Sequence, residues 1–405
     1  MSYISKKAVM MTTIDVETLL EQLIAIDSTS HRCNQLIAEL IAGHLEQLGF
    51  TVERTLYDDP KGVRKHNLVA RRDPLGTSAA IAASSASGTS SGLAYFAHND
   101  VVPAGRWTGP GGDPFTAVKD DTRIFGRGAC DMKGSLASML SAVASVPAEQ
   151  QTAPLWFVCT ADEETHLRGA EKMTLHSQVY AELAEADPVA IIGEPTRLHV
   201  VHAHKGIVSI RFESLGRAAH SSTSDGINAN VRMVPMLQTL CHWHHQSETD
   251  SRWHDDAFDV PTINWNFGFR DSSTVVNVVP DRSEAWVAFR PMPHTDVDGL
   301  IATLQQRADE LDVTMTVTGR CEPLWTDPNC ESVKAMSQLA SGYTDDATPT
   351  TVGYATDGAM LKQLSKRIIF GPGDIAQAHT TDEFIERDQL KRGVAAYIDS
   401  IRRWC

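Results

Sequence analysis

The chain has 405 residues, 42% hydrophobic and 21% charged, which is the composition of an ordinary soluble globular protein, and its length predicts two domains. Its formal net charge of −15, from 51 acidic and 36 basic residues, argues against a nucleic-acid or anionic-membrane partner, because both need clustered Lys and Arg. The apolar runs fall short of a membrane span and residues 1–11 lack the apolar core of a signal peptide, so we expect a cytoplasmic protein.

The N-terminal part predicts two helices and two short strands. Apolar residues recur with helical spacing between Thr13 and Phe50, and a break near residues 28–30 divides them into two helices. Residues 52–56 and 67–70 predict short strands. The Ser/Ala/Gly-rich run at 77–92 has too little apolar bulk to pack and predicts an exposed, mobile loop, with a linker between domains as the alternative.

The next part alternates strands with helices. Residues 93–97 predict a strand that ends in His98-Asn99-Asp100, and a glycine-rich turn at 126–134 leads into a helix. Residues 155–160 predict a buried strand that runs into three consecutive acids at 162–164. Residues 190–193 predict another strand, which runs into Glu194. This alternation is typical of an α/β domain.

The pattern changes near Lys205. Strands are predicted at 207–213, 262–269, 282–290 and 313–318, with helices at 229–243 and 297–311. Strand, helix, strand, strand, helix, strand is the order of a small α+β sandwich. The α/β pattern then returns, with helices at 332–340, 357–364 and 387–404 and a strand at 367–370. We therefore predict an α/β domain in two segments, 1–203 and 321–405, interrupted by an inserted α+β domain at 204–320.

Several predicted strands of the α/β domain end in residue types that bind metal ions. In open α/β sheets, ligands collect beyond the carboxyl ends of the strands. The candidates after strands are His98, Glu163, Glu164, Glu194 and His379, and Asp131 joins them from the glycine-flanked turn before a helix. Two histidines and three carboxylates suit two cations such as Zn²⁺, and one carboxylate can bridge them.

The adjacent acids Glu163 and Glu164 leave one carboxylate for proton transfer, because metal-assisted hydrolysis still needs a base. Taken alone, this acidic run would favour a helix N-terminus. Residues i and i+2 of an extended strand share a face, so Asp100 is placed to orient the ring of His98. For Asp162 we predict only local hydrogen bonding.

The motifs around these residues resemble those of the di-zinc aminoacylase/carboxypeptidase metallohydrolase family. They are His-x-Asp at 98–100, Gly-x-Gly-x-x-Asp-Met-Lys-Gly at 126–134, Asp-Glu-Glu at 162–164, Gly-Glu-Pro-Thr at 193–196 and Ala-His-Thr-Thr-Asp-Glu at 378–383. The resemblance implies a zinc-peptidase-like catalytic domain with a mixed, largely parallel sheet. It also implies that the insertion is a ferredoxin-like dimerisation or lid domain, and hence a homodimer.

The resemblance also implies roles for single residues. One Zn²⁺ would be held by His98, Asp131 and Glu194. The other would be held by Asp131, Glu164 and His379, with Asp131 bridging and Co²⁺ as a possible substitute metal. Glu163 resembles the general base, and Asp100 belongs to the same catalytic set.

Four further residues resemble contacts to the reacting substrate. His220 resembles an oxyanion stabiliser that reaches into the partner subunit's site, with a surface histidine as the alternative. Arg290 resembles the arginine that holds the substrate α-carboxylate, although a surface ion pair is equally common. Asn277 resembles a polar contact in the same domain. Asp357 would meet a basic substrate side chain, or would cap a helix.

Within the family, the runs at 161–165, 191–196, 203–206 and 371–379 are most similar to the acetylornithine deacetylases. This similarity implies an amidohydrolase that converts N2-acetyl-L-ornithine to L-ornithine and acetate in arginine biosynthesis. A succinyl-diaminopimelate desuccinylase and a metallo-dipeptidase or carboxypeptidase are the alternatives. A non-catalytic binding relative is a third alternative, but such a protein should have lost ligands that this chain keeps.

Overall fold

The computed structural model describes residues 14–75 and 91–405, and the chain divides into two compact units. Unit 1 takes in Met1–His202, Thr326–Pro349 and Thr356–Cys405, and unit 2 takes in Ala203–Trp325 and Thr350–Ala355. The loop predicted at 77–92 lies almost wholly outside the described residues, as does the segment 1–11. Within the described ranges, every helix is too short or too polar to cross a membrane.

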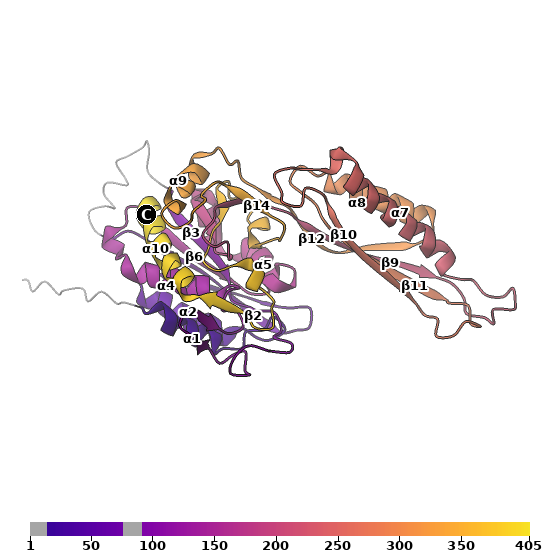
Figure 1. Cartoon of the computed structure of the whole chain (residues 1–405), viewed down its shortest axis with the longest axis horizontal. Coiled ribbons are helices and arrows are strands. Elements are labelled where there is room, and N and C mark those ends of the chain that lie inside the picture. The colour runs from indigo at the N-terminus through magenta and orange to yellow at the C-terminus, as the bar shows by residue number, and fades with distance from the viewer. Residues whose placement is uncertain (1–13, 76–90) are drawn as a thin grey trace, which may run out of the picture. The chain divides into compact units, whose positions relative to one another are not determined.

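Unit 1 is built on a mixed sheet in the order β1-β2-β6-β3-β7-β15-β8 (Figure 1). The strands are β1 Thr51–Asp58, β2 Arg64–Arg72, β3 Leu93–His98, β6 Leu155–Thr160, β7 Val189–Ile192, β8 Val201–His204 and β15 Arg367–Ile369. Strands β6, β3, β7 and β15 run parallel, whereas β1, β2 and β8 are antiparallel to their neighbours. The predicted mixed α/β sheet is confirmed.

Helices cover both faces of this sheet. They are α1 Val16–Ile24, α2 Gln35–Gln47, α4 Lys133–Ser145, α5 Arg168–His176, α6 Gln178–Ala186, α9 Glu331–Ala340 and α10 Arg387–Trp404. Along β6, Leu155 and Phe157 belong to a core shared with α1, α2, α4, α9 and α10. Trp156 and Val158 alternate with them toward the opposite face, and α5 packs against β6 and β2 (Figure 1). Coverage of both faces explains why the central strands are apolar throughout.

A helix cap and a glycine illustrate how single residues shape unit 1. Helix α1 begins after Asp15, whose carboxylate accepts a hydrogen bond from the main-chain N–H of Thr18 at 2.9 Å. At the end of β7, a Cβ on Gly193 would lie 2.5 Å from Ser135 Oγ and 2.6 Å from the Tyr95 hydroxyl. Only glycine therefore allows the chain to pass this close to α4 and β3 before Glu194.

A small antiparallel sheet in the order β16-β5-β4 lies in the same unit. Its strands are β4 Val118–Lys119, β5 Arg123–Phe125 and β16 Phe384–Glu386. Pairing of β5 with β16 brings the glycine-rich turn at 126–134 next to the segment after His379. These two segments are far apart in the sequence, and this sheet helps to bring them together.

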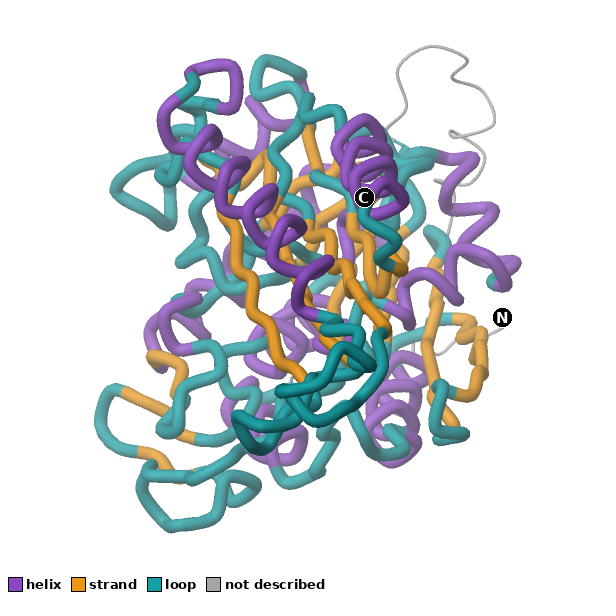
Figure 2. Tube along the Cα trace, turned by 90° about the vertical axis from the view of Figure 1, so that its right-hand side faces the viewer, coloured by secondary structure: helices purple, strands orange, loops and turns teal. Residues whose placement is uncertain are grey.

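Unit 2 has the order strand, helix, strand, strand, helix, strand. The elements are β9 Ile207–Leu215, α7 Asn230–Thr249, β10 Asn264–Asp271, β11 Arg282–Arg290, α8 Val297–Glu310 and β12 Thr314–Cys321. The antiparallel sheet order β10-β11-β9-β12 is the ferredoxin-like arrangement, and Figure 2 draws the strands of the chain in orange and its helices in purple. Phe212 and Phe289 of the sheet pack with Met236 and Leu240 of α7 and Leu304 of α8. Short strands β13 Leu324–Trp325 and β14 Thr350–Val352 pair with β8.

Some predicted elements differ from the structure. The helix predicted at 357–364 is wrong: the segment has only a 3-10 turn at Asp357–Ala359. Leu361 and Leu364 are buried, as the helical pattern suggested, but they lie in turns after it. The strand predicted at 262–269 runs instead as Asn264–Asp271. The helix predicted at 229–243 extends to Thr249, and the histidine-rich run 242–245 lies on it.

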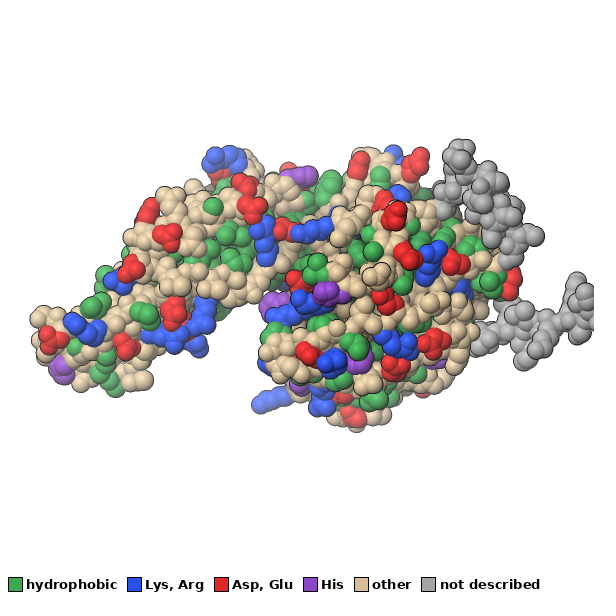
Figure 3. All heavy atoms as spheres, turned by 180° about the vertical axis from the view of Figure 1, so that it is seen from behind, with side chains coloured by type: hydrophobic (Ala, Val, Ile, Leu, Met, Phe, Trp, Pro, Cys, Tyr) green, Lys and Arg blue, Asp and Glu red, His purple; other side chains and the backbone are tan. Residues whose placement is uncertain are grey.

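Charges of both signs are interspersed on the face of the molecule seen in Figure 3. Exposed ion pairs of the chain include those of Arg54 with Glu39 and Glu46, at 3.0 Å each. Exposed pairs of this kind contribute little to stability. The negative net charge is thus spread over the surface and is not gathered into a single patch on this face.

Candidate metal centre

Three parallel strands of unit 1 end side by side and carry predicted ligands at their carboxyl ends. His98 is the last residue of β3 and pairs in register with Thr160, the last residue of β6. Glu194 follows β7 by two residues, and Glu163 and Glu164 stand in a 3-10 turn after β6. The shared direction of the strands therefore brings these side chains to one edge of the sheet.

Asp131 lies at the centre of the resulting cluster. Its Oδ1 is 3.0 Å from Nε2 of His98, and its Oδ2 is 3.5 Å from Nε2 of His379. Nε2 of His98 is 3.9 Å from Oε1 of Glu194, and Nε2 of His379 is 3.0 Å from Oε2 of Glu164. The five predicted ligands thus come together, and the two oxygens of Asp131 face different histidines.

The charges of this cluster fit a site for cations. Burial raises the pKa of the Glu163 and Glu194 carboxyls well above the usual range, and neighbouring carboxylates add to the rise. Burial opposes the protonation of His98, but its hydrogen bond to Asp131 and the charges of Glu194 and Glu163 raise its pKa well above the ordinary value. One ligand atom each from His98, Asp131 and Glu164 lie within 4.8 Å of one another. Nitrogen and oxygen donors that share this excess of negative charge suit divalent metal ions.

Asp100 is buried beside His98 and contacts its ring, but mainly through the main-chain carbonyl. Because β3 ends at His98, the strand alternation does not extend to Asp100, and Nδ1 of His98 is 2.9 Å from the Asp100 carbonyl oxygen. The carboxylate Oδ1 is farther from Nδ1, at 3.7 Å, and instead accepts the main-chain N–H of Glu163 at 3.1 Å. Oδ2 accepts the Ser30 hydroxyl at 2.7 Å. Asp100 therefore supports both the histidine and the acidic turn.

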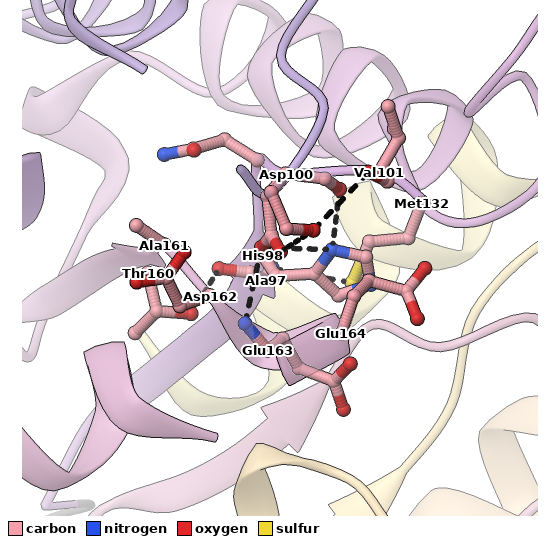
Figure 4. A network of polar contacts seen from close by, with 12 residues as sticks. Ala97, His98, Asp100, Val101, Met132, Thr160, Ala161, Asp162, Glu163 and Glu164 are labelled. Carbon is pink, nitrogen blue, oxygen red and sulfur yellow. Dashed lines mark hydrogen bonds and ion pairs between the residues drawn. The ribbon is translucent and has the colours of Figure 1, made fainter. Parts of the chain in front are cut away.

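The acidic turn presents its two glutamates differently. Figure 4 shows the carboxylates of Glu163 and Glu164 pointing in different directions from adjacent positions. Glu164 is within hydrogen-bond distance of His379, whereas the charges of Glu194 and Asp357 act on Glu163. One acid can therefore bind metal while its neighbour stays available for proton transfer.

Asp162, for which only local hydrogen bonding was predicted, has long-range partners on β1 and β2. Its Oδ1 is 2.8 Å from Nζ of Lys65, and both side chains are almost fully buried, at 3% and 1% exposed. The Tyr57 hydroxyl donates to Oδ2 at 2.9 Å. Lys65 also donates to the carbonyls of Ser30 and Arg32. The buried ion pair thus anchors the first residue of the acidic run.

Sequence reasoning missed these partners, together with Asn67. The Asn67 side chain accepts the main-chain N–H of Ala161 and donates to the Gly169 carbonyl, both at 2.9 Å, and so holds both ends of the segment after β6. Residues 64–67 are polar in sequence and carry no pattern that distinguishes a buried Lys65 from a surface one. Only the pairing of β2 with β6 reveals their role.

Asp357 is buried and reaches the cluster from the 3-10 turn that it opens. Its Oδ2 accepts the hydroxyl of Thr160, and burial raises its pKa to about 6. Thr356 accepts the capping hydrogen bond of this turn, so the alternative that Asp357 caps a helix is wrong. In the described part of the chain, Oδ1 of Asp357 has no hydrogen-bond partner.

The predicted substrate contacts His220, Asn277 and Arg290 lie in unit 2. His220 is exposed and its Nδ1 is 2.7 Å from the Ser222 hydroxyl, while the main-chain N–H of Ser221 donates to the Asn277 carbonyl at 2.9 Å. Arg290 ends β11 and is partly buried. Burial, with a smaller contribution from the charge of Arg290, lowers the pKa of Lys205 to about 8.

Comparisons with known proteins give a consistent picture. Residues 94–403 match the model of peptidase family M20/M25/M40. An acetylornithine deacetylase of Myxococcus xanthus is 34% identical over 399 residues, which are 95% of this chain and 96% of that protein.

Solved structures share the fold. The match to an M20-family metallo-carboxypeptidase of Sulfolobus solfataricus covers 97% of this chain and 99% of that one, with a TM-score of 0.73 and 18% identity. A dinuclear metal-binding peptidase of the same family from Bacillus subtilis gives a TM-score of 0.65 at 13% identity, with 96% of each chain covered.

We predict that Lys65→Met destabilises the protein by about 3–5 kcal/mol, because it leaves the Asp162 charge buried without its partner. Urea denaturation followed by tryptophan fluorescence measures this change. Lys61→Met is the matched control, since Lys61 is exposed at the turn before β2 and should shift the free energy of unfolding by less than about 0.5 kcal/mol. Equal stability of the two variants would contradict the anchoring role.

Proposed function

Because the chain belongs to peptidase family M20/M25/M40, it is a metal-dependent hydrolase, and we propose that it removes the acetyl group from N2-acetyl-L-ornithine. The products would be L-ornithine and acetate. The observation that carries the choice of a basic substrate is the buried Asp357, whose Oδ1 has no hydrogen-bond partner among the described residues. A buried carboxylate oxygen of this kind suits the side-chain ammonium of ornithine. The similarity to an acetylornithine deacetylase over nearly the whole chain supports the same substrate.

The proposed metal complement is two Zn²⁺ per chain, with Co²⁺ as a possible substitute. One ion would bind to His98, Asp131 and Glu194, and the other to Asp131, Glu164 and His379. The arrangement of the two Asp131 oxygens toward different histidines supports a bridging role for this residue. When bound, the ions supply Lewis-acid polarisation of the amide carbonyl and lower the pKa of water.

Glu163 is the proposed general base and acid. Its carboxylate would take the proton of the attacking water and return it to the departing amine of ornithine. The Asp100 carboxylate fixes the main chain of Glu163 by accepting its N–H, and thereby helps to aim the base.

Three residues of unit 2 are proposed as further contacts to the substrate. Arg290 would hold the α-carboxylate of the substrate, since a guanidinium matches a carboxylate with two parallel hydrogen bonds. In the described residues Arg290 forms no ion pair of its own, which supports this role over the surface-pair alternative. Asn277 would add a polar contact, and His220 would stabilise the oxyanion.

The proposal extends to the assembly. His220 would act in the site of the partner subunit, so that the enzyme works as a homodimer formed through unit 2. With acetylornithine as substrate, the enzyme would serve arginine biosynthesis in the cytoplasm. No nucleic-acid or membrane partner is proposed.

The substrate assignment is tested by comparing purified enzyme on two substrates. We expect N2-acetyl-L-ornithine to be hydrolysed with a kcat/KM at least about 100-fold above that for N-succinyl-diaminopimelate, because only the former presents a short acyl group together with a lone side-chain ammonium. Release of free amine measures both reactions. Faster cleavage of the succinyl compound or of dipeptides would overturn the acetylornithine assignment and place the enzyme with those activities.

The division of labour between the two glutamates gives a second prediction. Glu163→Ala should lower kcat by about 100-fold or more while both metal ions remain bound, because it removes only the proton acceptor. Glu164→Ala should lose metal, because it removes a proposed ligand that lies beside His379, a ligand of the same ion. Metal content by mass spectrometry and kcat are measured on the same samples. Metal loss in the first variant and retention in the second would mean that the two roles are exchanged.

The role of Asp357 gives a third prediction. Asp357→Asn should lower kcat/KM for acetylornithine by about 10- to 100-fold, the loss expected for one hydrogen bond to a charged group. N-acetyl-norvaline, which lacks the side-chain ammonium, serves as the matched substrate and should lose less than about 3-fold. An equal loss on both substrates would show that Asp357 supports the centre without recognising the side chain.

A further inference from the structure

One buried carboxylate joins the two loops that carry Asp131 and His379. Glu383 follows His379 by four residues, and its side chain is 1% exposed. Oε2 accepts the Arg127 guanidinium at 2.7 Å and the main-chain N–H of Gly128 at 2.8 Å. Oε1 accepts the main-chain N–H groups of Cys130 at 2.9 Å and Asp131 at 3.0 Å. Glu383 therefore stands at the centre of the turn that presents Asp131.

This arrangement leaves Glu383 no capacity to bind metal itself. An ionised carboxylate offers about four acceptor positions, and the four hydrogen bonds use all of them. Successive N–H groups that converge on one anion form a nest, and here the chain supplies the anion from its own sequence. The turn reaches this shape through Gly128, which has a φ of 81° and whose Cβ would lie 2.6 Å from Val101.

Further hydrogen bonds extend the link to the His379 loop. The Arg127 guanidinium donates to the carbonyl of Thr380 at 2.8 Å, next to His379, and the main-chain N–H of Gly126 donates to the Glu383 carbonyl at 3.0 Å. The Asp131 turn and the His379 loop are thus joined by both side-chain and main-chain hydrogen bonds. The Arg127 side chain is 2% exposed, so the ion pair is shielded from solvent and salt.

His379 needs such support more than the other ligands do. Its side chain is 55% exposed, whereas that of His98 is 1% exposed and is fixed by the surrounding core. The His379 main chain also has a positive φ of 63°, which costs free energy in a residue with a side chain. Packing alone therefore does not hold the His379 ring toward Asp131 and Glu164.

We propose that Glu383, paired with Arg127, is a positioning residue that sets the Asp131 and His379 loops before metal binds. This inference rests on the ligand set proposed above. It implies that Glu383 selectively strengthens the site formed by Asp131, Glu164 and His379, because that site takes two of its ligands from the linked loops. The site of His98 and Glu194, whose ligands follow β3 and β7, depends on Glu383 only through Asp131.

The test uses Glu383→Gln in the full chain. Glutamine keeps the shape of the side chain but places an amide N–H₂ where one oxygen accepted two donors. Asp382→Asn is the matched control, because Asp382 is the adjacent acid and is exposed. Zn²⁺ dissociation constants are measured by titrating the metal-free proteins against a competing chelator. Hydrogen exchange of the metal-free proteins reports the amides of Gly128, Cys130 and Asp131.

In Glu383→Gln, we expect the weaker Zn²⁺ dissociation constant to rise about 10- to 100-fold, the range typical of lost supporting hydrogen bonds at metal sites. The tighter constant should change less than about 3-fold, and exchange at the three amides should accelerate at least 10-fold without a matching change in β3 and β6. Asp382→Asn should match the wild type in both measurements. Unchanged constants, equal weakening of both ions, or acceleration spread over the whole unit would overturn the proposal.

If Glu383→Gln does not fold, Glu383→Asp replaces it under the same criteria, since aspartate keeps the charge but cannot reach all four donors. Neither measurement involves a substrate. A protein that shows the expected metal and exchange effects but does not cleave acetylornithine would therefore overturn the substrate proposal and leave this inference standing.

Discussion

The structure depends on the crowding of carboxylates at one sheet edge. Asp131, Glu163, Glu164, Glu194 and Asp357 approach one another where β3, β6 and β7 end, and burial makes their charges costly. Such a cluster persists only if positive charge enters it or if protons neutralise it. Metal ions held by these side chains would remove the conflict. The same free energy that opposes the cluster in the absence of metal favours cation binding.

Two buried ion pairs hold the cluster in place without belonging to it. Lys65 pairs with Asp162 beneath the acidic turn, and Arg127 pairs with Glu383 beneath the turn of Asp131. Each pair also satisfies main-chain groups, which offsets the cost of burying charge. The proposed ligands therefore lie on turns whose main chain is held by these two buried ion pairs. These pairs explain how irregular segments can present metal ligands as firmly as strands do.

Much of the fold and of the ligand cluster could be predicted from the sequence, because local residue patterns determine them. Apolar runs and their periods predicted the α/β domain and the α+β insertion. Strand ends marked by His98, Glu164 and Glu194 predicted which residues would meet. The supporting pairs could not be found in this way. Arg127 and Glu383 are 256 residues apart, and nothing in their neighbours distinguishes a buried pair from two surface charges. Asp100 lies against the His98 ring as predicted, but mainly through its carbonyl oxygen, because β3 ends at His98, two residues before Asp100.

The two histidines of the centre differ in their exposure to solvent. His98 is enclosed by the core at the end of β3, whereas more than half of the His379 side chain is open to solvent. Metal bound beside His98 would exchange slowly and keep little water, because its surroundings exclude solvent. The His379 side is exposed, so water and a substrate would reach the cluster there without opening the sheet. Reactants would enter at the exposed side of the centre, which is also the side where packing holds the ligands least. Positioning of the His379 loop by Glu383 would therefore compensate for this lack of packing.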